Sequence, residues 1–265
     1  MGTRASYEPG TFSWVDLATS DPAGAKAFYG ELLGWDAKDS PVPGGGVYTT
    51  CSIGGASVAA LYELRADQRG AGMAPHWLSY VTVAGADEVT ARAEELGGAI
   101  HMEPFDVMEA GRMAVLADPP GAAFAIWEPR EAIGAERVNE PGCLTWNDLA
   151  TTDPERAQRF YGELFGWGFE AVDSGGGPRY WVIGHDGGSA GRNGGMREMG
   201  PDEAGIPPHW MPYFAVESAD ATAEQAQSAG GRLLAGPMAL PAGRVAALTD
   251  PQGAAFAVFA GELDD

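Results

Sequence analysis

PGTFSWVDLATSDPAGAKAFYGELLGW, residues 9–35, returns as PGCLTWNDLATTDPERAQRFYGELFGW at residues 141–167, with 17 of 27 positions identical. The similarity continues downstream, because PHWLSY at residues 75–80 returns as PHWMPY at residues 208–213. Solenoid and propeller repeats are about 20 to 50 residues long, whereas this repeat has the length of an ordinary domain. The sequence therefore predicts two tandem copies of one domain.

The repeat also predicts the domain boundaries. Residues 9–128 form the first domain and residues 141–260 the second, and the polar, charged stretch at residues 129–140 is the expected linker. Residues 1–8 precede the first copy and are expected to be a short tail.

Composition limits the class of partner. The chain has 16 basic and 37 acidic residues, a net charge of −21, which repels phosphate backbones and anionic lipids. We therefore expect a small-molecule ligand and neither nucleic acid nor a membrane as partner. No apolar run approaches the roughly 18 residues of a membrane span, and the N-terminus does not resemble a signal peptide, which favours a cytoplasmic protein. Cys51 and Cys143 lie at non-equivalent positions, which excludes a duplicated disulfide or a paired zinc site.

Hydrophobic periodicity predicts the order of helices and strands in the first copy. Asp21-Pro22 is typical of a helix start and Gly34 of a helix end, which indicates a helix at residues 22–33. A loop is expected at residues 65–75. The remaining expected elements are strands at 11–18, 47–53, 58–64, 77–83, 100–102, 113–116 and 122–127 and a helix at 86–96.

Two motifs occur once in each copy, A-x-x-F-Y-G-x-L-x-G-W in the helix and D-P-x-G-A-A-F-A in the last turn and strand. Their residues are Ala25, Phe28, Tyr29, Gly30, Leu32, Gly34, Trp35, Asp118, Pro119, Gly121 and Phe124, and in the second copy Ala157, Phe160, Tyr161, Gly162, Leu164, Gly166, Trp167, Asp250, Pro251, Gly253 and Phe256. With these motifs the chain resembles the glyoxalase/bleomycin-resistance/extradiol-dioxygenase superfamily, the vicinal oxygen chelate proteins. Within it the chain is similar to a two-domain actinobacterial branch often labelled glyoxalase or hydroxylase. The resemblance implies an α+β fold, in which each domain is two βαβββ modules that form an open β-cup.

In metal-dependent members, His, Gln or Glu side chains from the first and last strands of the modules hold a divalent ion inside the cup. Carried onto this sequence, those positions are occupied by Trp14, Leu78, Ala125, Trp146, Met211 and Ala257. Indole, thioether and alkyl groups are poor ligands for the metals that imidazole and carboxylate bind. We therefore expect no metal at the usual site and no cofactor.

The two-residue period of a strand predicts which side chains share the cup face with these positions. They are predicted to contact a ligand and are Trp14, Asp16, His76, Tyr80 and Trp127 in the first cup and Trp146, Asp148, His209, Tyr213 and Phe259 in the second. Aromatic walls with one carboxylate, one imidazole and one phenol are typical of a site for a flat or apolar small molecule.

Each of these residues also has a structural interpretation. In this interpretation the tryptophans and tyrosines fill the core, and the histidines are hydrogen-bonded to nearby groups at the strand entrance. The aspartates would accept hydrogen bonds from the backbone or from Arg112 and Arg244. The glycine-rich segments at residues 43–46, 175–177 and 187–195 are expected to be hairpin loops at the cup rim.

Three functions remain open. The first is a metal-independent binding protein for a small aromatic or apolar metabolite. The second is an enzyme of the same superfamily, such as a hydroxylase, lyase or isomerase, either metal-free with Asp16 or His76 as general base or with a displaced metal at these two residues. The third is a structural protein with filled cups. We expect a monomer that is an internal pseudo-dimer, with a homodimer as the alternative, and the divergence of residues 187–200 predicts that the two cups differ.

Overall fold

The structure is a computed structural model that describes residues 2–43, 45–173, 177–185 and 192–263. It contains two similar domains, each built on one eight-stranded sheet. The elements of the first domain are β1 (Phe12–Thr19), α1 (Pro22–Leu33), β2 (Asp36–Pro41), β3 (Val47–Ile53), β4 (Ala56–Glu63), α2 (Ala66–Gly70), β5 (His76–Thr82), α3 (Ala86–Glu95), β6 (Ala99–Val107), β7 (Gly111–Ala117) and β8 (Ala123–Pro129).

The second domain repeats this order. Its elements are β9 (Leu144–Thr151), α4 (Pro154–Phe165), β10 (Trp167–Val172), β11 (Tyr180–His185), β12 (Arg192–Glu198), the 3₁₀ turn η1 (Pro201–Glu203), β13 (His209–Ala215), α5 (Ala219–Ser228), β14 (Arg232–Leu240), β15 (Gly243–Thr249) and β16 (Ala255–Gly261). The predicted tandem α+β fold of βαβββ modules is confirmed.

The repeated helices begin and end as their motifs predict. The Asp21 side chain accepts a hydrogen bond from the backbone of Gly24 at 3.0 Å, and Asp153 does the same in α4 with Arg156 at 3.0 Å. Both helices end at a glycine with positive φ, 75° at Gly34, a conformation that costs glycine little.

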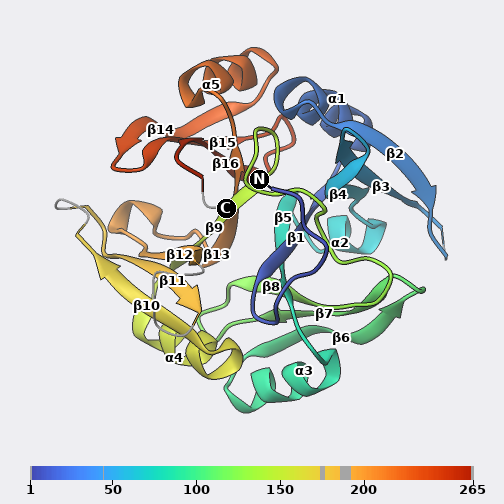
Figure 1. Cartoon of the computed structure of the whole chain (residues 1–265), viewed down its shortest axis with the longest axis vertical. Helices are drawn as coiled ribbons and strands as arrows, with labels where there is room; N and C mark the ends of the chain where they lie inside the picture. The colour runs from blue at the N-terminus through green and yellow to red at the C-terminus, as the bar shows by residue number, and fades with distance from the viewer. Residues whose placement is uncertain (1, 44, 174–176, 186–191, 264–265) are drawn as a thin grey trace.

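The strand order explains the open cup. It is β2-β3-β4-β1-β5-β8-β7-β6 in the first sheet and β10-β11-β12-β9-β13-β16-β15-β14 in the second. The first strand of each module lies in the middle of its sheet, where β1 and β5 pair antiparallel. Figure 1 shows the two sheets curling away from each other, with one cup open between β2 and β6 and the other between β10 and β14. Both sheets stay open at their edges.

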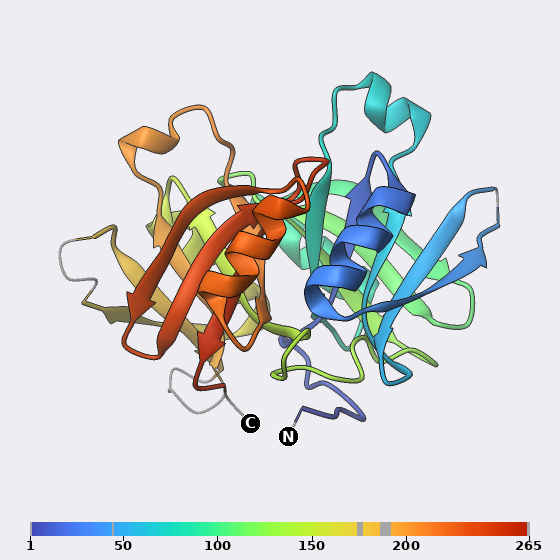
Figure 2. The same ribbon diagram turned by 90° about the horizontal axis from the view of Figure 1, so that it is seen from above.

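The helices and the outer faces of the sheets form the contact between the domains. Helix α1 packs beside α5 of the other domain, as Figure 2 shows, and α3 packs beside α4. The buried cores follow this exchange, because one core joins Leu17 and Phe28 of the first domain to Phe256 of the second. The other joins Phe124 of the first domain to Phe160 of the second. Each half of one domain therefore completes its core with the opposite half of the other.

Polar contacts cross the same boundary in symmetric pairs. The Trp77 indole donates to the Tyr29 hydroxyl at 3.1 Å, and this hydroxyl donates to Asp250 of the other domain at 3.2 Å. In the second contact Trp210 donates to the Tyr161 hydroxyl at 2.8 Å, and this hydroxyl interacts with the side chain of Asp118 of the first domain. The tyrosine motif residues therefore connect each helix to the opposite domain.

Three expectations about local structure were wrong. The loop at 65–75 contains the short helix α2. Strand β2 was not predicted, because all six of its residues are exposed and no hydrophobic alternation marks it. Gly194 and Gly195 lie inside strand β12 and not in a hairpin loop. Residues 43, 45 and 46 lie between the paired strands β2 and β3, and residue 177 lies between β10 and β11, as predicted, whereas positions 44, 175–176 and 187–191 lie outside the described residues.

The N-terminal residues pack on the linker. The Tyr7 hydroxyl donates to the backbone carbonyl of Ala135 at 2.6 Å, and Thr3 forms a β-bridge with Arg137. Across the described part of the chain, the helices are all too short or too polar to span a bilayer.

Replacing Tyr29 by phenylalanine should destabilise the protein by about 1–3 kcal/mol, because buried Trp77 and Asp250 each lose a hydrogen-bond partner. Urea denaturation of Tyr29→Phe, and of Tyr161→Phe in the second contact, measures this loss. Tyr62→Phe is the matched control, since this half-buried tyrosine lies away from the domain contact. Equal stability of all three variants would show that the hydroxyls do not hold the domains together.

Candidate functional site

The concave face of the first sheet, here called the first cup, gathers side chains from neighbouring strands. In the register of β1 and β5, Trp14 lies opposite Tyr80, and Asp16 lies opposite Leu78. Tyr80 in turn pairs with Ala125 on β8. Leu78, Tyr80, Ala125 and Trp127 form a hydrophobic cluster on the concave face, separate from the two domain-bridging cores, and Trp14 packs against it.

Asp16 is the polar centre of the first cup. It is 2% exposed, and its Oδ2 atom accepts a hydrogen bond from the Tyr80 hydroxyl at 2.6 Å. The Tyr48 hydroxyl lies 3.4 Å from the same oxygen and accepts a hydrogen bond from the Trp14 indole at 3.1 Å. The other oxygen, Oδ1, is buried and has no hydrogen-bond partner among the described residues.

Burial raises the pKa of Asp16 to about 7, and the hydrogen bonds from Tyr80 and Tyr48 oppose this rise only in part. Burial also raises the pKa of both tyrosines well above the usual 10, so their hydroxyls stay protonated and can donate. A carboxyl group that titrates near neutral pH can therefore accept or donate a proton in this cup.

The concave face of the second sheet, the second cup, contains the same arrangement around Asp148. Its Oδ2 accepts from the Tyr213 hydroxyl at 2.7 Å. Its Oδ1 accepts from the Tyr180 hydroxyl at 2.8 Å and from the Trp146 indole at 2.9 Å. Burial raises the pKa of Asp148, and the nearby Arg197 acts in the opposite direction.

Sequence reasoning missed three residues of these faces. Tyr48 and Tyr180 lie on β3 and β11, two strands away from the aspartates, and reach across the intervening strand. Their separation equals the repeat offset of 132 residues, which marks them as equivalent positions but does not place them beside the aspartates. Tyr62 on β4 also faces this cup, where its ring stacks on that of Tyr48 with centroids 6.3 Å apart.

The histidines do not join the aspartates. His76 lies at the start of β5 opposite Ala18, and its Nδ1 is 2.9 Å from the backbone oxygen of Ala74. The Nδ1 of His209 makes the same contact with the backbone oxygen of Pro207 at 2.9 Å. Each imidazole is thus tied to its own strand entrance.

The two remaining predicted residues lie on the last strands. Trp127 is 8% exposed and donates to the backbone oxygen of Ala132 at 2.8 Å, whereas Phe259 on β16 is half-buried. The expected contact of Arg112 and Arg244 with the cup aspartates was wrong. Arg112 pairs with Asp87, and Arg244 pairs with Asp220, because both arginines lie on the helix-covered side of their strands.

The residues of the first cup do not fit the metal that related folds bind. Trp14, Leu78 and Ala125 lie close together on the concave face, as the resemblance requires, but they offer no lone pair to a divalent ion. Asp16 is the buried carboxylate beside them, and its tyrosine neighbours are protonated donors. Among the described residues, no three His, Cys, Asp or Glu side chains lie together in a metal-binding group.

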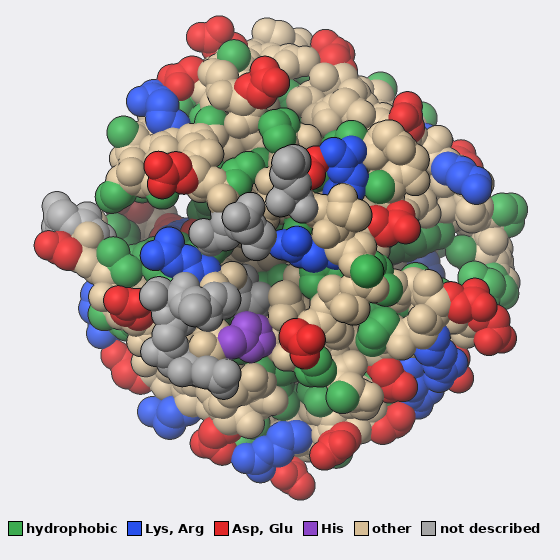
Figure 3. Space-filling view, in the orientation of Figure 1, with side chains coloured by type: hydrophobic (Ala, Val, Ile, Leu, Met, Phe, Trp, Pro, Cys, Tyr) green, Lys and Arg blue, Asp and Glu red, His purple; other side chains and the backbone are tan. Residues whose placement is uncertain are grey.

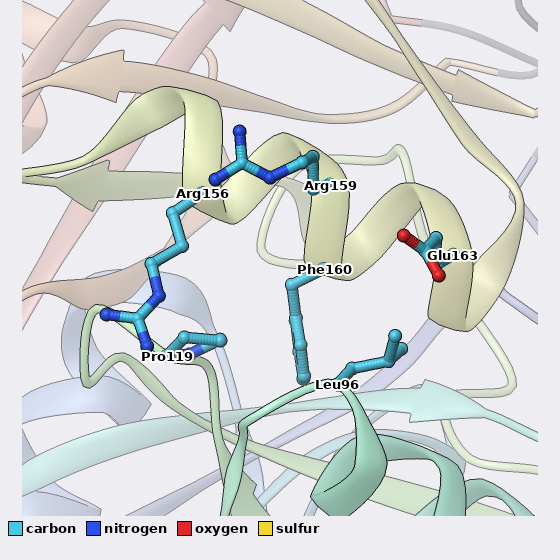
Figure 4. A pocket seen from close by; sticks show the side chains of 6 residues that line it. All are labelled: Leu96, Pro119, Arg156, Arg159, Phe160 and Glu163. Carbon is cyan, nitrogen blue, oxygen red and sulfur yellow. The ribbon is translucent and has the colours of Figure 1, made fainter.

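A separate surface groove of about 210 Å³ lies outside both cups, where α4 meets the end of α3 (Figure 4). Its lining is Leu96, Pro119, Arg156, Arg159, Phe160 and Glu163. Figure 3 shows acidic side chains spread over the molecular face, with basic side chains between them, and indentations on both sides where the cups open. The groove shares no residue with the predicted cup sites.

The raised pKa of Asp16 gives a prediction for stability against pH. Its pKa is about 7 in the folded protein, against 3.8 for an ordinary aspartate, so the folded state binds more protons between these limits. Its contribution to the free energy of unfolding is therefore largest below pH 4 and falls as pH rises toward 7, at up to about 1.4 kcal/mol per pH unit. Asp16→Asn should remove this slope, which chemical denaturation at a series of pH values measures.

Asp87→Asn is the control, because this exposed carboxylate has a lowered pKa and should change the profile only below about pH 4. Parallel profiles for wild type and Asp16→Asn between pH 4 and 7 would show that Asp16 is ionised throughout that range.

Comparison with known proteins identifies relatives along nearly the whole chain. The chain is 43% identical over 262 residues to "Putative glyoxylase CFP32" of Mycobacterium tuberculosis, covering 97% of both chains. It is 38% identical over 269 residues to "Anthracycline biosynthesis protein DnrV" of Streptomyces peucetius, covering 95% of this chain and 94% of that one.

Solved structures share the fold at low sequence identity. The Mn(II)-bound glyoxalase from Novosphingobium aromaticivorans superposes with a TM-score of 0.66 at 16% identity, covering all of this chain and 85% of that one. The 2,3-dioxygenase LapB from Pseudomonas sp. KL28 gives a TM-score of 0.65 at 15% identity, covering 98% and 96% of the two chains. The sequence profile of one superfamily matches twice, at residues 11–126 and 144–258. The chain belongs to the Glyoxalase/Bleomycin resistance protein/Dioxygenase superfamily.

Proposed function

We propose that the cups bind a small planar aromatic or apolar molecule without a metal ion. One observation carries the proposal: in both domains a buried aspartate on the concave face is surrounded by a tryptophan and two tyrosines that donate to it or to each other. The same arrangement in two diverged copies supports a role beyond filling the cup.

The chemistry of the face matches a ligand of this class. Trp14 and Tyr48 are half-buried, so ring surface remains available for stacking, and Leu78 and Ala125 add apolar surface beside them. A mostly apolar site with a few polar groups that fix orientation is the usual design of small-molecule pockets. The relative named for anthracycline biosynthesis favours the same class, since an anthracycline is a fused-ring aromatic compound.

One observation favours an enzyme as the second candidate. The pKa of Asp16, about 7, suits a general acid or base near neutral pH. In that case Asp16 would take a proton from a bound substrate, and Asp16→Asn would abolish turnover while leaving binding intact. A binding protein would show no consumption of its ligand in either form.

We extend the proposal to a monomer that acts in the cytoplasm, as the sequence favours.

Trp14→Ala should weaken binding of a planar aromatic probe, 2-naphthylmethanol, by about 1–3 kcal/mol, because the variant removes aromatic contact area from the first cup. Isothermal titration calorimetry on the full chain measures this change. Trp181→Ala is the matched control, because Trp181 is a half-buried tryptophan on the outer face of the second sheet, packed against the core between the domains.

Two results would contradict the cup as the binding site. One is absence of probe binding to the wild type, and the other is equal affinity of Trp14→Ala and wild type. An Arg156→Ala variant locates the probe in that second case, because its loss of binding would place the ligand in the groove beside α4.

A further inference from the structure

The two cups differ at the strand beside each aspartate. Asp16 pairs with Ala60 on β4, and Asp148 pairs with Gly195 on β12. Two residues further along, Tyr62 in the first cup corresponds to Arg197 in the second, since these residues pair with Ala18 and Ala150 of the repeated strands. Both differences change what the carboxylate contacts.

Gly195 allows Asp148 to be fully hydrogen-bonded. A Cβ atom at this position would overlap with both the Tyr180 hydroxyl and the Oδ1 atom of Asp148. Without it, Tyr180 and Trp146 reach Oδ1 at 2.8 and 2.9 Å, while Tyr213 donates to the other oxygen. The second carboxylate therefore has donors on both oxygens.

Ala60 has a methyl group in the corresponding place of the first cup, because neighbours in register on parallel strands face the same side. The Tyr48 hydroxyl accordingly lies 3.4 Å from Oδ2 and does not reach Oδ1. Asp16 Oδ1 is thus a buried acceptor without a donor in the described structure, in a residue only 2% exposed. An unsatisfied buried oxygen is costly and points to a group that arrives with the ligand.

The charged neighbours of the two aspartates also differ. In the second cup Arg197 lies near Asp148 and is held in a two-pronged ion pair by Glu203, at 2.7 and 2.6 Å. In the first cup the corresponding residue is Tyr62, and Asp16 forms no ion pair with the described residues. A cation supplied by the protein in one cup is replaced by an aromatic ring in the other.

We propose that the first cup binds an organic cation, a protonated amine on an aromatic or apolar body, with the ammonium group against Oδ1 of Asp16. Tyr80 and Tyr48 contact this carboxylate, Trp14 donates to Tyr48, and Tyr62 stacks on Tyr48. Aromatic rings so close to the binding site favour a cation over its neutral analogue through their negative faces. The net charge of −21 favours approach of cations as well. This inference rests on the proposed binding function and specifies its ligand class.

Cation binding changes the protonation of Asp16. Burial raises its pKa to about 7 in the empty cup, and a bound ammonium group favours the ionised carboxylate. At pH 6 the carboxyl O–H bond therefore breaks on binding, and the proton passes to the buffer. No covalent bond to the ligand forms.

The test compares 2-naphthylmethylammonium with its neutral analogue 2-naphthylmethanol by calorimetry on the full chain. The amine should bind with one equivalent per chain and at least tenfold more tightly than the alcohol. At pH 6 its binding heat should depend on the ionisation heat of the buffer, as proton release requires. Asp16→Asn should abolish the preference for the amine, whereas Asp87→Asn, which removes an exposed charge outside the cup, should retain it.

Tyr62→Arg is the second variant, because it copies the cation of the second cup into the first and should weaken amine binding at least tenfold. Thermal unfolding confirms that each variant is folded. If Asp16→Asn does not fold, amine binding by Tyr62→Arg tests the cation inference in its place. Equal affinity of amine and alcohol for the wild type, with both weakened in Trp14→Ala, would overturn the cation inference and keep the proposed function. Binding of neither probe would overturn both.

Discussion

Each eight-stranded sheet has two faces, and the domain contact covers only one of them. Helices α1 and α5, with α3 and α4, lie between the two sheets and join half of one domain to half of the other in a shared core. The buried tyrosines Tyr29 and Tyr161 connect the two domains through the side chains of Asp250 and Asp118. The opposite, concave faces must therefore be completed by their own side chains or by a ligand.

On those concave faces, each buried aspartate lies among aromatic and apolar side chains. Trp14 and Ala125 lie on the same face as Asp16 and cannot bind a metal ion, and no ion pair among the described residues balances the charge of Asp16. Hydrogen bonds from tyrosine hydroxyls stabilise the buried carboxylates, and burial raises their pKa, which favours the neutral form. In the second cup a neighbouring arginine also stabilises the charge. Gly195 in the second cup leaves room for donors to both oxygens of Asp148. Its counterpart in the first cup is Ala60, and there Oδ1 of Asp16 has no donor among the described residues.

Sequence alone predicted the fold because the repeat and the helix motifs are local signals, and strand parity placed Trp14, Asp16 and Tyr80 on one face. It could not place Tyr48, because contact across two strands depends on sheet order, which no local pattern reports. The predicted contact of Arg112 with Asp16 was wrong for a related reason. Arg112 pairs instead with Asp87, which lies on the helix α3 packed beside its strand. Polar strands such as β2 also leave no hydrophobic pattern to detect.

The central claim is that Asp16 is a buried carboxyl group without a cation. Carbon-13 NMR of the aspartate carboxyl carbons, titrated from pH 3 to 9, tests it most directly, with Asp16→Asn assigning the resonance. The account predicts a carboxyl resonance that titrates at a pH of about 7 and is missing from the variant. If the resonance lost in Asp16→Asn titrates at or below pH 4, then the group is solvated or paired with a cation, and the account of the first cup is wrong.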